Sequence, residues 1–336
     1  MSNYHQLATT IRIVSHNMNR QRPALDSLLN SARTTADIIL LQEINITDPA
    51  FATTHPAFTL VLPPRGDRAS NRTAAYINRT NPYLKVSQRT DICTDPDLQV
   101  LEVGTDLIPA FFLLNIYNER DPETQTYTIP RSLSPLSLPR RCVITGDLNA
   151  HHALWNSATR TPKRASELVH LMEQENWRLV SVPDTPTHYY QQGTRSSVID
   201  LTLASPAMME EVGNWAIDDE LATGSDHEVI RFDIQTVHPD IEPTPPPERL
   251  NWRKTDWALF STTLQASISA STTQWSQYAS NPTPENLDAW ARDAREHILD
   301  AARASTPVLQ VTPRSKRWWT VEVTTARKDK IGRAHV

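Results

Sequence analysis

The 336-residue sequence is poor in cysteine, in long apolar runs and in excess positive charge, and each shortage excludes a class of protein. Its two cysteines, Cys93 and Cys142, cannot make a disulfide scaffold and fit a reducing intracellular environment; neither has the partners of a zinc site. No apolar run approaches the roughly 18 residues of a membrane span, and no secretion signal opens the chain. We therefore expect neither a membrane protein nor a secreted one.

The formal net charge of −5 is unevenly distributed along the chain. The residues from Arg314 onward include seven basic and two acidic side chains, a net charge of +5, so the residues before Arg314 carry a net charge of −10. A protein that binds nucleic acid through its bulk charge is strongly basic. Any role with nucleic acid must therefore depend on a local site.

The most informative stretch of the sequence runs from Arg141 to Asn149. Residues 142–144 form an apolar run typical of a buried strand, and Gly146 ends it. Asp147 and Asn149 follow two residues apart, a spacing that places both on one face of an extended segment. A carboxylate beside a carboxamide suits the binding of an anion next to a metal ion or a base. The alternative is an Asx turn, in which both side chains only satisfy backbone N–H groups.

The chain as far as residue 234 predicts an α/β domain. Strands over 11–17 and 37–43 flank a helix that Pro23 opens, with leucines at helical spacing. Such a strand–helix–strand unit is typical of α/β folds. We expect a second helix over 162–176 and a surface loop over 121–139. The remaining predicted strands cover 58–62, 73–78, 84–93, 98–103, 108–118, 179–182, 187–190, 198–204 and 229–234.

Polar residues repeatedly follow the predicted strands, at positions where sites assemble in α/β proteins. They are Asn17, Glu43, Tyr117, Asp147 with Asn149, Asp200, and Asp226 with His227. Structural alternatives exist, because Glu43 can cap a helix and Tyr117 can be a buried tyrosine with a satisfied hydroxyl. Asp200 lies in an apolar strand and needs a partner if it is buried, and His227 is the candidate. A satisfied core pair is the alternative for these two.

This ordered set resembles the endonuclease/exonuclease/phosphatase superfamily, which includes apurinic endonucleases, deoxyribonuclease I and several phosphoesterases. The matching motifs are Asn17, Leu41-Gln42-Glu43, Tyr117, Gly146-Asp147-Leu148-Asn149, Ile199-Asp200 and Ser225-Asp226-His227, all between residues 11 and 234. More narrowly, residues 149–155 and Pro186-Thr187-His188 resemble the apurinic-endonuclease-like endonuclease domain of a non-LTR (LINE-type) retrotransposon. The sequence departs from the pattern at Asn19, where many apurinic endonucleases carry a metal-binding aspartate.

The resemblance implies a fold and a cofactor. The fold is a four-layer α/β sandwich, two mostly antiparallel sheets flanked by helices, followed by a helical linker. The cofactor is Mg²⁺, with Mn²⁺ as an alternative, and its implied protein ligands are Glu43 and Asp226. Mg²⁺ prefers oxygen ligands and binds through one or two carboxylates together with substrate phosphate. Whether one metal ion binds or two stays open.

The resemblance also implies a role for each polar residue. Asp200 would hold the tautomer of His227. The donors of hydrogen bonds to the phosphate oxygens would be Asn17, Asn149 and Tyr117. Asp147 would orient or deprotonate the attacking water. The choice of general base between Asp147 and His227 stays open.

The implied function is a Mg²⁺-dependent endonuclease that nicks DNA in the nucleus and leaves a 3′-hydroxyl to prime reverse transcription. One rival function is a phosphoesterase acting on small phosphates, and loops without arginine or aromatic residues beside the site would favour it. The other rival is an inactive copy that serves only as a nucleic-acid-binding module. All the catalytic motif residues are present, which argues against an inactive copy. The net negative charge argues against a protein that only binds nucleic acid.

Target choice must come from loops beside the site, because contacts to phosphate carry no sequence information. The candidates for DNA contact are Arg65 and Arg68 in the 63–71 loop with Arg72 beside it, His151 in the 151–155 segment, and Arg195 in the 191–197 segment, just before the strand that carries Asp200. Arginine can read guanine edges or enter a narrow minor groove. The alternative for each arginine is an ordinary solvated loop position.

Five prolines between Pro239 and Pro247 predict a semi-rigid linker. We expect a catalytic domain over 1–238, the linker over 239–247, and a helical segment over 248–330 in which Thr283 caps one helix.

The helical segment over 248–330 resembles the region before a reverse transcriptase, so the retrotransposon RNA and a reverse transcriptase are expected partners, although no polymerase follows. Residues 331–336 match the translation of a common sequencing adapter, and we expect them to be an artefactual end.

Overall fold

The computed structural model describes residues 7–48, 52–64, 70–190, 195–221, 223–235 and 250–308. The chain divides into two compact units, Met1–Pro245 and Pro246–Val336, and each is described by itself. The predicted linker over 239–247, the basic tail and residues 331–336 lie outside the described residues. None of the helices in the described ranges combines the length and the apolar character needed to span a bilayer.

The first unit contains two six-stranded sheets. The first sheet has the order β13-β14-β1-β2-β4-β3, in which β1 and β2 run parallel and all other neighbours antiparallel. Its strands are β1 (Thr10–Asn17), β2 (Ile38–Ile46), β3 (Phe58–Val61), β4 (Asn71–Asn78), β13 (Val212–Ile217) and β14 (Ile230–Gln235).

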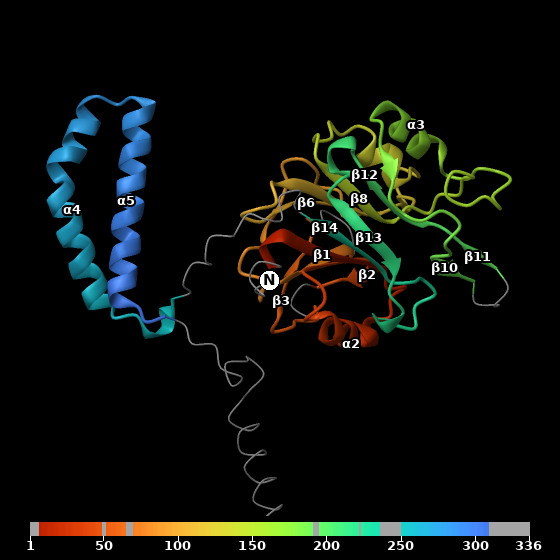
Figure 1. The fold of residues 1–336 in the computed structure, drawn as a ribbon, viewed down its shortest axis with the longest axis horizontal. Coiled ribbons are helices and arrows are strands. Elements are labelled where there is room, and N and C mark those ends of the chain that lie inside the picture. The colour runs from red at the N-terminus through yellow and green to blue at the C-terminus, as the bar shows by residue number, and fades with distance from the viewer. Residues whose placement is uncertain are drawn as a thin grey trace, which may run out of the picture. The chain divides into compact units, whose positions relative to one another are not determined.

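The second sheet has the order β5-β6-β7-β8-β12-β9, and β7 and β8 form its parallel pair. Its strands are β5 (Lys85–Gln88), β6 (Leu98–Gly104), β7 (Phe111–Tyr117), β8 (Cys142–Asp147), β9 (Arg178–Leu179) and β12 (Asp200–Ala204). A two-stranded ladder of β10 (His188–Tyr189) and β11 (Ser196–Ser197) projects beside the sheets (Figure 1). Short 3-10 turns are η3 (Pro206–Met208) and η4 (Asp219–Leu221).

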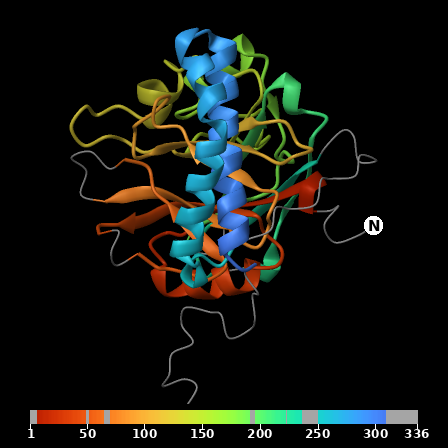
Figure 2. The ribbon, with the colours of Figure 1, turned by 90° about the vertical axis from the view of Figure 1, so that its left-hand side faces the viewer.

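Three apolar clusters hold four layers together. The two sheets pack face to face through a cluster that includes Ile13 and Leu40 from the first sheet and Leu113 and Val143 from the second. A second cluster lies between the first sheet and α2 (Arg22–Ala32), and a third lies between the second sheet and α3 (Ser166–Gln174). Figures 1 and 2 show α2 on the outer face of the first sheet. The predicted four-layer sandwich of mostly antiparallel sheets is confirmed.

Two segments differ from the prediction. The expected surface loop over 121–139 contains a π-helical turn, η2 (Ile129–Leu133), whose Ile129 and Leu133 are buried in the cluster beneath α3. Two prolines and several hydroxyl residues around this turn leave no sustained period in the sequence, which is why the turn was not predicted. Strand β13 was not predicted either, because Gly213 and Asn214 interrupt its alternation and its register shifts beyond Gly213.

Gly146 is the position in β8 where any side chain would collide with backbone. Its φ is +139°, and a Cβ atom there would lie 2.1 Å from the carbonyl oxygen of Ile116 on the neighbouring strand β7. Gly146→Ala should therefore lower the free energy of unfolding by more than about 2 kcal/mol. Gly213→Ala is the matched control, since a Cβ at Gly213 meets nothing within 4 Å, and its effect should stay within about 0.5 kcal/mol. Urea unfolding would measure both, and equal effects would contradict the prediction.

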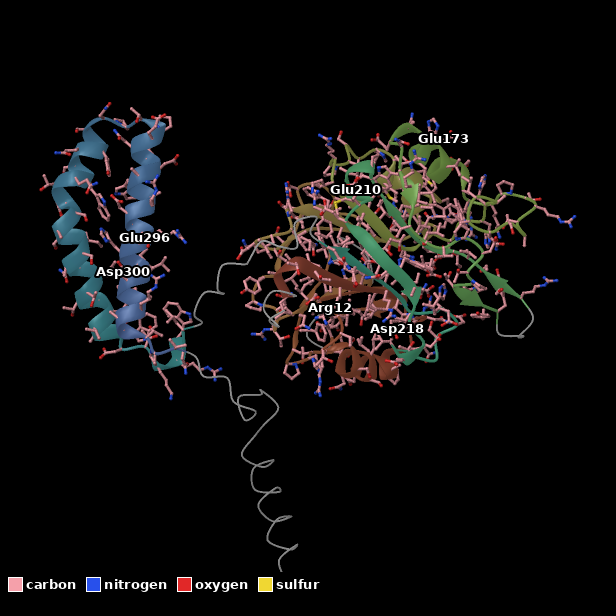
Figure 3. The ribbon with its side chains drawn as sticks, in the orientation of Figure 1. Arg12, Glu173, Glu210, Asp218, Glu296 and Asp300 are labelled. Atoms are coloured by element: carbon pink, nitrogen blue, oxygen red, sulfur yellow. The ribbon has the colours of Figure 1, made fainter. Side chains whose placement is uncertain are left out.

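The described part of the second unit is helical, as predicted, and forms a hairpin of two helices. Its helices are α4 (Trp257–Ser280) and α5 (Pro284–Ser305), preceded by the short turn η5 (Trp252–Lys254). Thr283 caps α5 by accepting a hydrogen bond from the backbone N–H of Asn286. The two helices lie side by side (Figure 1) and contact through the rings of Trp275 and Trp290, whose centroids are 5.8 Å apart. Glu296 and Asp300 on α5 are exposed (Figure 3).

Candidate active site

Polar side chains from both sheets meet at one edge of the sandwich. Asn17 ends β1, Tyr117 ends β7 and Asp147 ends β8. The strand register places Tyr117 and Asp200 on the two sides of Asp147. Because β1 and β2 are parallel, as are β7 and β8, the carboxyl ends of these four strands open toward the same edge.

A cleft of about 270 Å³ opens at this edge. The predicted catalytic residues in its lining are Glu43, Tyr117, Asp147, Asn149, Asp226 and His227. Asn17 and Asp200 are almost fully buried behind the lining and contact it through hydrogen bonds. The sequence motifs therefore come together in space, while their chemical roles stay predictions.

Asp147 lies at the centre of the hydrogen-bond network. Its carboxylate accepts from Asn17 Nδ2 at 2.9 Å and from the backbone N–H and Nδ2 of Asn149 at 2.9 and 3.2 Å. The contact with the Asn149 N–H is the Asx turn that the sequence left as an alternative, and it coexists with the cleft. Burial, followed by the charge of Asp200, raises the pKa of Asp147 to about 8.

Asp200 and His227 form a buried pair. His227 Nδ1 lies 3.0 and 2.9 Å from the two carboxylate oxygens of Asp200. A carboxylate only accepts, so Nδ1 carries a proton and Nε2 is left for other partners. Burial lowers the pKa of His227, but the charge and the hydrogen bond of Asp200 outweigh it and raise the pKa to about 9. Thr187 fixes the start of β12, because its Oγ1 accepts from the N–H groups of Ile199 and Asp200.

Glu43 and Tyr117 lie on the other side of Asn17. Asn17 Nδ2 donates to Glu43 Oε1 at 3.2 Å as well as to Asp147, so one amide spans two carboxylates. The backbone of Glu43 has φ +51° and that of Asn149 has φ +48°, a left-handed conformation that costs a residue with a side chain about 1–3 kcal/mol. Burial, helped by the charges of Glu43 and Asp147, raises the pKa of Tyr117 and keeps its hydroxyl protonated.

The donor set suits a hard divalent cation. Glu43 and Asp226, the predicted ligands, are carboxylates that line the same cleft as Asn149. The hydrogen-bond donors to Asp147 are neutral amides, so a nearby cation would offset the desolvation of its buried charge. Asn19, the departure from the family pattern, donates from Nδ2 to Asp226 Oδ1 at 2.8 Å and so positions a candidate ligand.

The predicted DNA contacts have different outcomes. Arg65 and Arg68 lie outside the described residues. His151 lines the cleft, and its backbone pairs with Lys163 through hydrogen bonds of 2.8 and 3.0 Å. Arg195 is exposed at the start of β11 and is not among the residues that line the cleft. Its role stays a prediction.

Several cleft residues were not predicted as site residues. Lys163 and Arg164 reach the cleft through the backbone pairing with His151, a contact that no local pattern in the sequence signals. Tyr190 follows β10 and also lines the cleft. His188 was part of the Pro186-Thr187-His188 motif, and this motif was the signal that could have placed it in the site.

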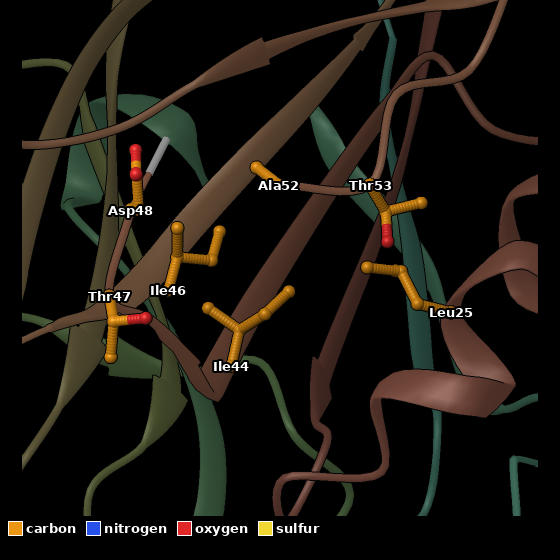
Figure 4. Close-up of a pocket in the computed structure, with 7 residues that line it drawn as sticks. All are labelled: Leu25, Ile44, Ile46, Thr47, Asp48, Ala52 and Thr53. Atoms are coloured by element: carbon orange, nitrogen blue, oxygen red, sulfur yellow. The ribbon is translucent and has the colours of Figure 1, made fainter. Parts of the chain in front are cut away.

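A second, smaller hollow is separate from this chemistry. It has a volume of about 30 Å³, and Figure 4 shows Leu25, Ile44 and Ile46 on its walls. Most of its lining side chains are apolar or small, with Asp48 as the charged exception. It is too small for a substrate, and we read it as a packing gap between α2 and the end of β2.

Comparison with known proteins finds one matching family model and solved structures of similar fold. Residues 111–231 match the family model described as endonuclease-reverse transcriptase. No curated protein matches the sequence. The endonuclease domain of TRAS1, a telomere-specific non-LTR retrotransposon, matches with 21% identity and a TM-score of 0.55, over 68% of this chain and 99% of that one. The AP endonuclease LMAP from Leishmania major matches with 14% identity and a TM-score of 0.52, over 68% of this chain and 88% of that one.

The family model spans the segment from β7 to β14, which carries six of the eight predicted catalytic residues. The two structural matches each cover 68% of this chain and show a shared fold rather than a shared activity. The resemblance stated from the sequence motifs is thus confirmed, and the chain has the fold of the endonuclease/exonuclease/phosphatase superfamily, as in apurinic endonucleases and a retrotransposon endonuclease domain.

Proposed function

We propose that the chain is a divalent-metal-dependent endonuclease that nicks DNA and leaves a 3′-hydroxyl from which reverse transcription is primed. The observation that carries the proposal is the convergence of Asp147, the Asp200–His227 pair and Glu43 in one open cleft. The TRAS1 and LMAP folds and the endonuclease-reverse transcriptase family model support the same reaction class.

Each residue has a role that its contacts allow. Glu43 and Asp226 would hold Mg²⁺, or Mn²⁺ as an alternative, and the bound ion would offset charge on the phosphate. Asn149 and Tyr117 line the cleft and would donate to the phosphate oxygens. For this the Tyr117 hydroxyl would turn away from Glu119, to which it donates at 3.1 Å. Asn17 holds the carboxylates of Glu43 and Asp147 in place.

We assign the base to Asp147 and the phosphate donor to His227. Asp147 is held by amide donors that lock its position. In its ionised form, which a bound cation would favour by offsetting the desolvation of its charge, it accepts a proton from water as that water attacks phosphorus. His227 is paired with Asp200 and stays protonated near neutral pH, so its Nε2–H donates to the phosphate. The bond from phosphorus to the 3′ oxygen breaks, and this oxygen leaves with the electron pair, takes a proton from solvent water and becomes the 3′-hydroxyl, while the phosphate stays on the 5′ side of the nick.

A DNA substrate fits the cleft better than a small phosphate does. The rim carries Lys163, Arg164 and Tyr190 in addition to His151, so cationic and aromatic side chains surround the reacting groups. Backbone phosphates and stacked bases match such a surface. We propose that residues 1–238 carry the activity, that the DNA target is met in the nucleus, and that the retrotransposon RNA and a reverse transcriptase are partners.

Glu43→Gln tests the metal requirement. The substitution removes one charge and keeps the side-chain size, so metal-dependent nicking of supercoiled plasmid should fall by at least about 10²-fold while the protein stays folded. Wild-type nicking should require Mg²⁺ and stop in EDTA. Glu173→Gln is the matched control, because Glu173 is exposed on α3 (Figure 3), and it should nick normally. If Glu43→Gln nicked DNA at the wild-type rate at saturating Mg²⁺, the assignment of Glu43 as a metal ligand would be wrong.

A further inference from the structure

Two histidines and an aspartate form a compact cluster at one side of the cleft. The candidate ligand atoms of His188, Asp226 and His227 all lie within 4.8 Å of one another. The backbone brings them together, because His188 and His227 form an antiparallel bridge. The N–H of Tyr189 donates to the carbonyl of Asp226 at 2.7 Å, and the N–H of Glu228 donates to that of Thr187 at 2.8 Å. The cluster is therefore built into the fold.

Each of the three side chains is oriented by its own outer partner. His227 Nδ1 donates to Asp200, which leaves Nε2 free to coordinate. His188 Nδ1 lies 3.2 Å from Ser197 Oγ, and His188 Nε2 lies 3.5 Å from Asp226 Oδ2. The other oxygen of Asp226 accepts from Asn19 at 2.8 Å.

We propose that His188, Asp226 and His227 form a second metal site that binds a transition metal ion of the zinc class. Two imidazole nitrogens and one carboxylate oxygen are a common three-ligand set for zinc, with water or substrate in the fourth position. Imidazoles that bind metals almost always donate their other N–H to a carboxylate, carbonyl or water. Asp200 accepts from His227 in this way, and Ser197 Oγ is within reach to accept from His188 Nδ1 once Nε2 binds the metal.

The ligand chemistry and spacing favour zinc over magnesium. Two ligands about 2.0–2.2 Å from a tetrahedral zinc ion lie about 3.4 Å apart, and the His188–Asp226 separation is 3.5 Å. The other separations of at most 4.8 Å can close by rotation of the side chains. Mg²⁺ prefers oxygen ligands and octahedral geometry, whereas imidazole suits zinc, copper and nickel.

Occupation of this site would compete with the reaction. The ion would take His227 Nε2 and Asp226, so Zn²⁺ should block nicking even in excess Mg²⁺; this consequence rests on the proposed function. His188→Ala should raise the Zn²⁺ concentration that halves nicking, measured against the variant's own rate in Mg²⁺ alone, because it removes a zinc ligand. Binding of zinc itself does not depend on nicking and can be measured separately.

Zinc binding to the full chain, measured by competition with a chromophoric zinc chelator, tests the proposal. The wild type should bind one Zn²⁺ in excess Mg²⁺. His188→Ala should weaken that binding at least about tenfold, and Ser197→Ala should weaken it by about tenfold as well, because losing an outer partner typically costs about 10–100-fold. His170→Ala is the matched control, since it removes an exposed imidazole from α3, and it should bind normally.

The outcomes separate the site from the proposed function. Equal zinc affinity in the wild type, His188→Ala and Ser197→Ala, or no stoichiometric binding in the wild type, would overturn the metal site and leave the proposed nuclease function untouched. Far-UV circular dichroism would confirm that each variant is folded. If His188→Ala does not fold, Ser197→Ala still tests the proposal.

Discussion

His227→Ala and Asp200→Asn should each reduce nicking by about 10²–10⁴-fold, and the double variant should be little worse than the poorer single one. The pair is buried, and both oxygens of Asp200 lie about 3 Å from His227 Nδ1, so loss of either partner disables the other. Asp200→Asn can present an amide N–H toward Nδ1, which favours the wrong tautomer of the ring.

A double-mutant cycle on supercoiled plasmid in Mg²⁺ would measure this coupling. His170→Ala serves as the control for loss of an imidazole far from the cleft, and it should leave the rate unchanged. Strictly multiplicative losses would show that Asp200 and His227 act independently, and the assignment of His227 as an oriented donor would then be wrong.

Asp147→Asn should remove nearly all nicking and, at the same time, make the protein less sensitive to alkaline pH. The substitution keeps the size of the side chain but removes its ability to accept a proton, so the rate should fall by at least about 10³-fold. Asn149→Ala should be milder, because it leaves the carboxylate and its hydrogen bond from Asn17 in place. A smaller loss in Asp147→Asn than in Asn149→Ala would argue against Asp147 as the base.

The stability effect of Asp147→Asn follows from the raised pKa of Asp147. Between the unfolded value of about 3.9 and the folded value of about 8, the folded chain holds a proton that the unfolded chain has released. Stability therefore falls as pH rises through this window, with a slope of at most about 1.4 kcal/mol per pH unit. The variant lacks this contribution.

Urea unfolding in EDTA at pH 5 and pH 8 measures this contribution. The stability of Asp147→Asn relative to the wild type should increase from pH 5 to pH 8. A difference between variant and wild type that does not change with pH would show that the carboxyl of Asp147 titrates normally in the folded protein.

The sequence predicted the layers of the fold because buried strands and amphipathic helices leave periodic patterns. The strand that ends in Asn17 and the helix that Pro23 opens were confirmed at nearly their predicted bounds. Strand β13 and the turn around Ile129 were not predicted. A glycine and an asparagine break the alternation of β13, and prolines obscure the period of the residues around Ile129. Their burial depends on contacts with distant segments.

The motifs predicted which residues face the cleft, but their contacts depended on tertiary structure. The sequence paired Asp200 with His227 because a carboxylate in an apolar strand needs a partner, and the structure confirms that contact. It could not place Lys163 beside His151 or His188 beside His227, because isolated backbone bridges between loops make both contacts. It also gave no sign that Arg72, one of the candidates for DNA contact, forms an ion pair with Asp97.

The chemistry of the nick is the most direct test of the proposed function. Supercoiled plasmid would be nicked by the wild-type chain in Mg²⁺, and the products would be given at once to a DNA polymerase with labelled nucleotides. If the bond to the 3′ oxygen is the one that breaks, the nicks carry a 3′-hydroxyl and extend without further treatment, while Asp147→Asn yields no labelled product. Extension that requires prior removal of a 3′-phosphate, or the absence of any nick in Mg²⁺, would contradict the proposed reaction.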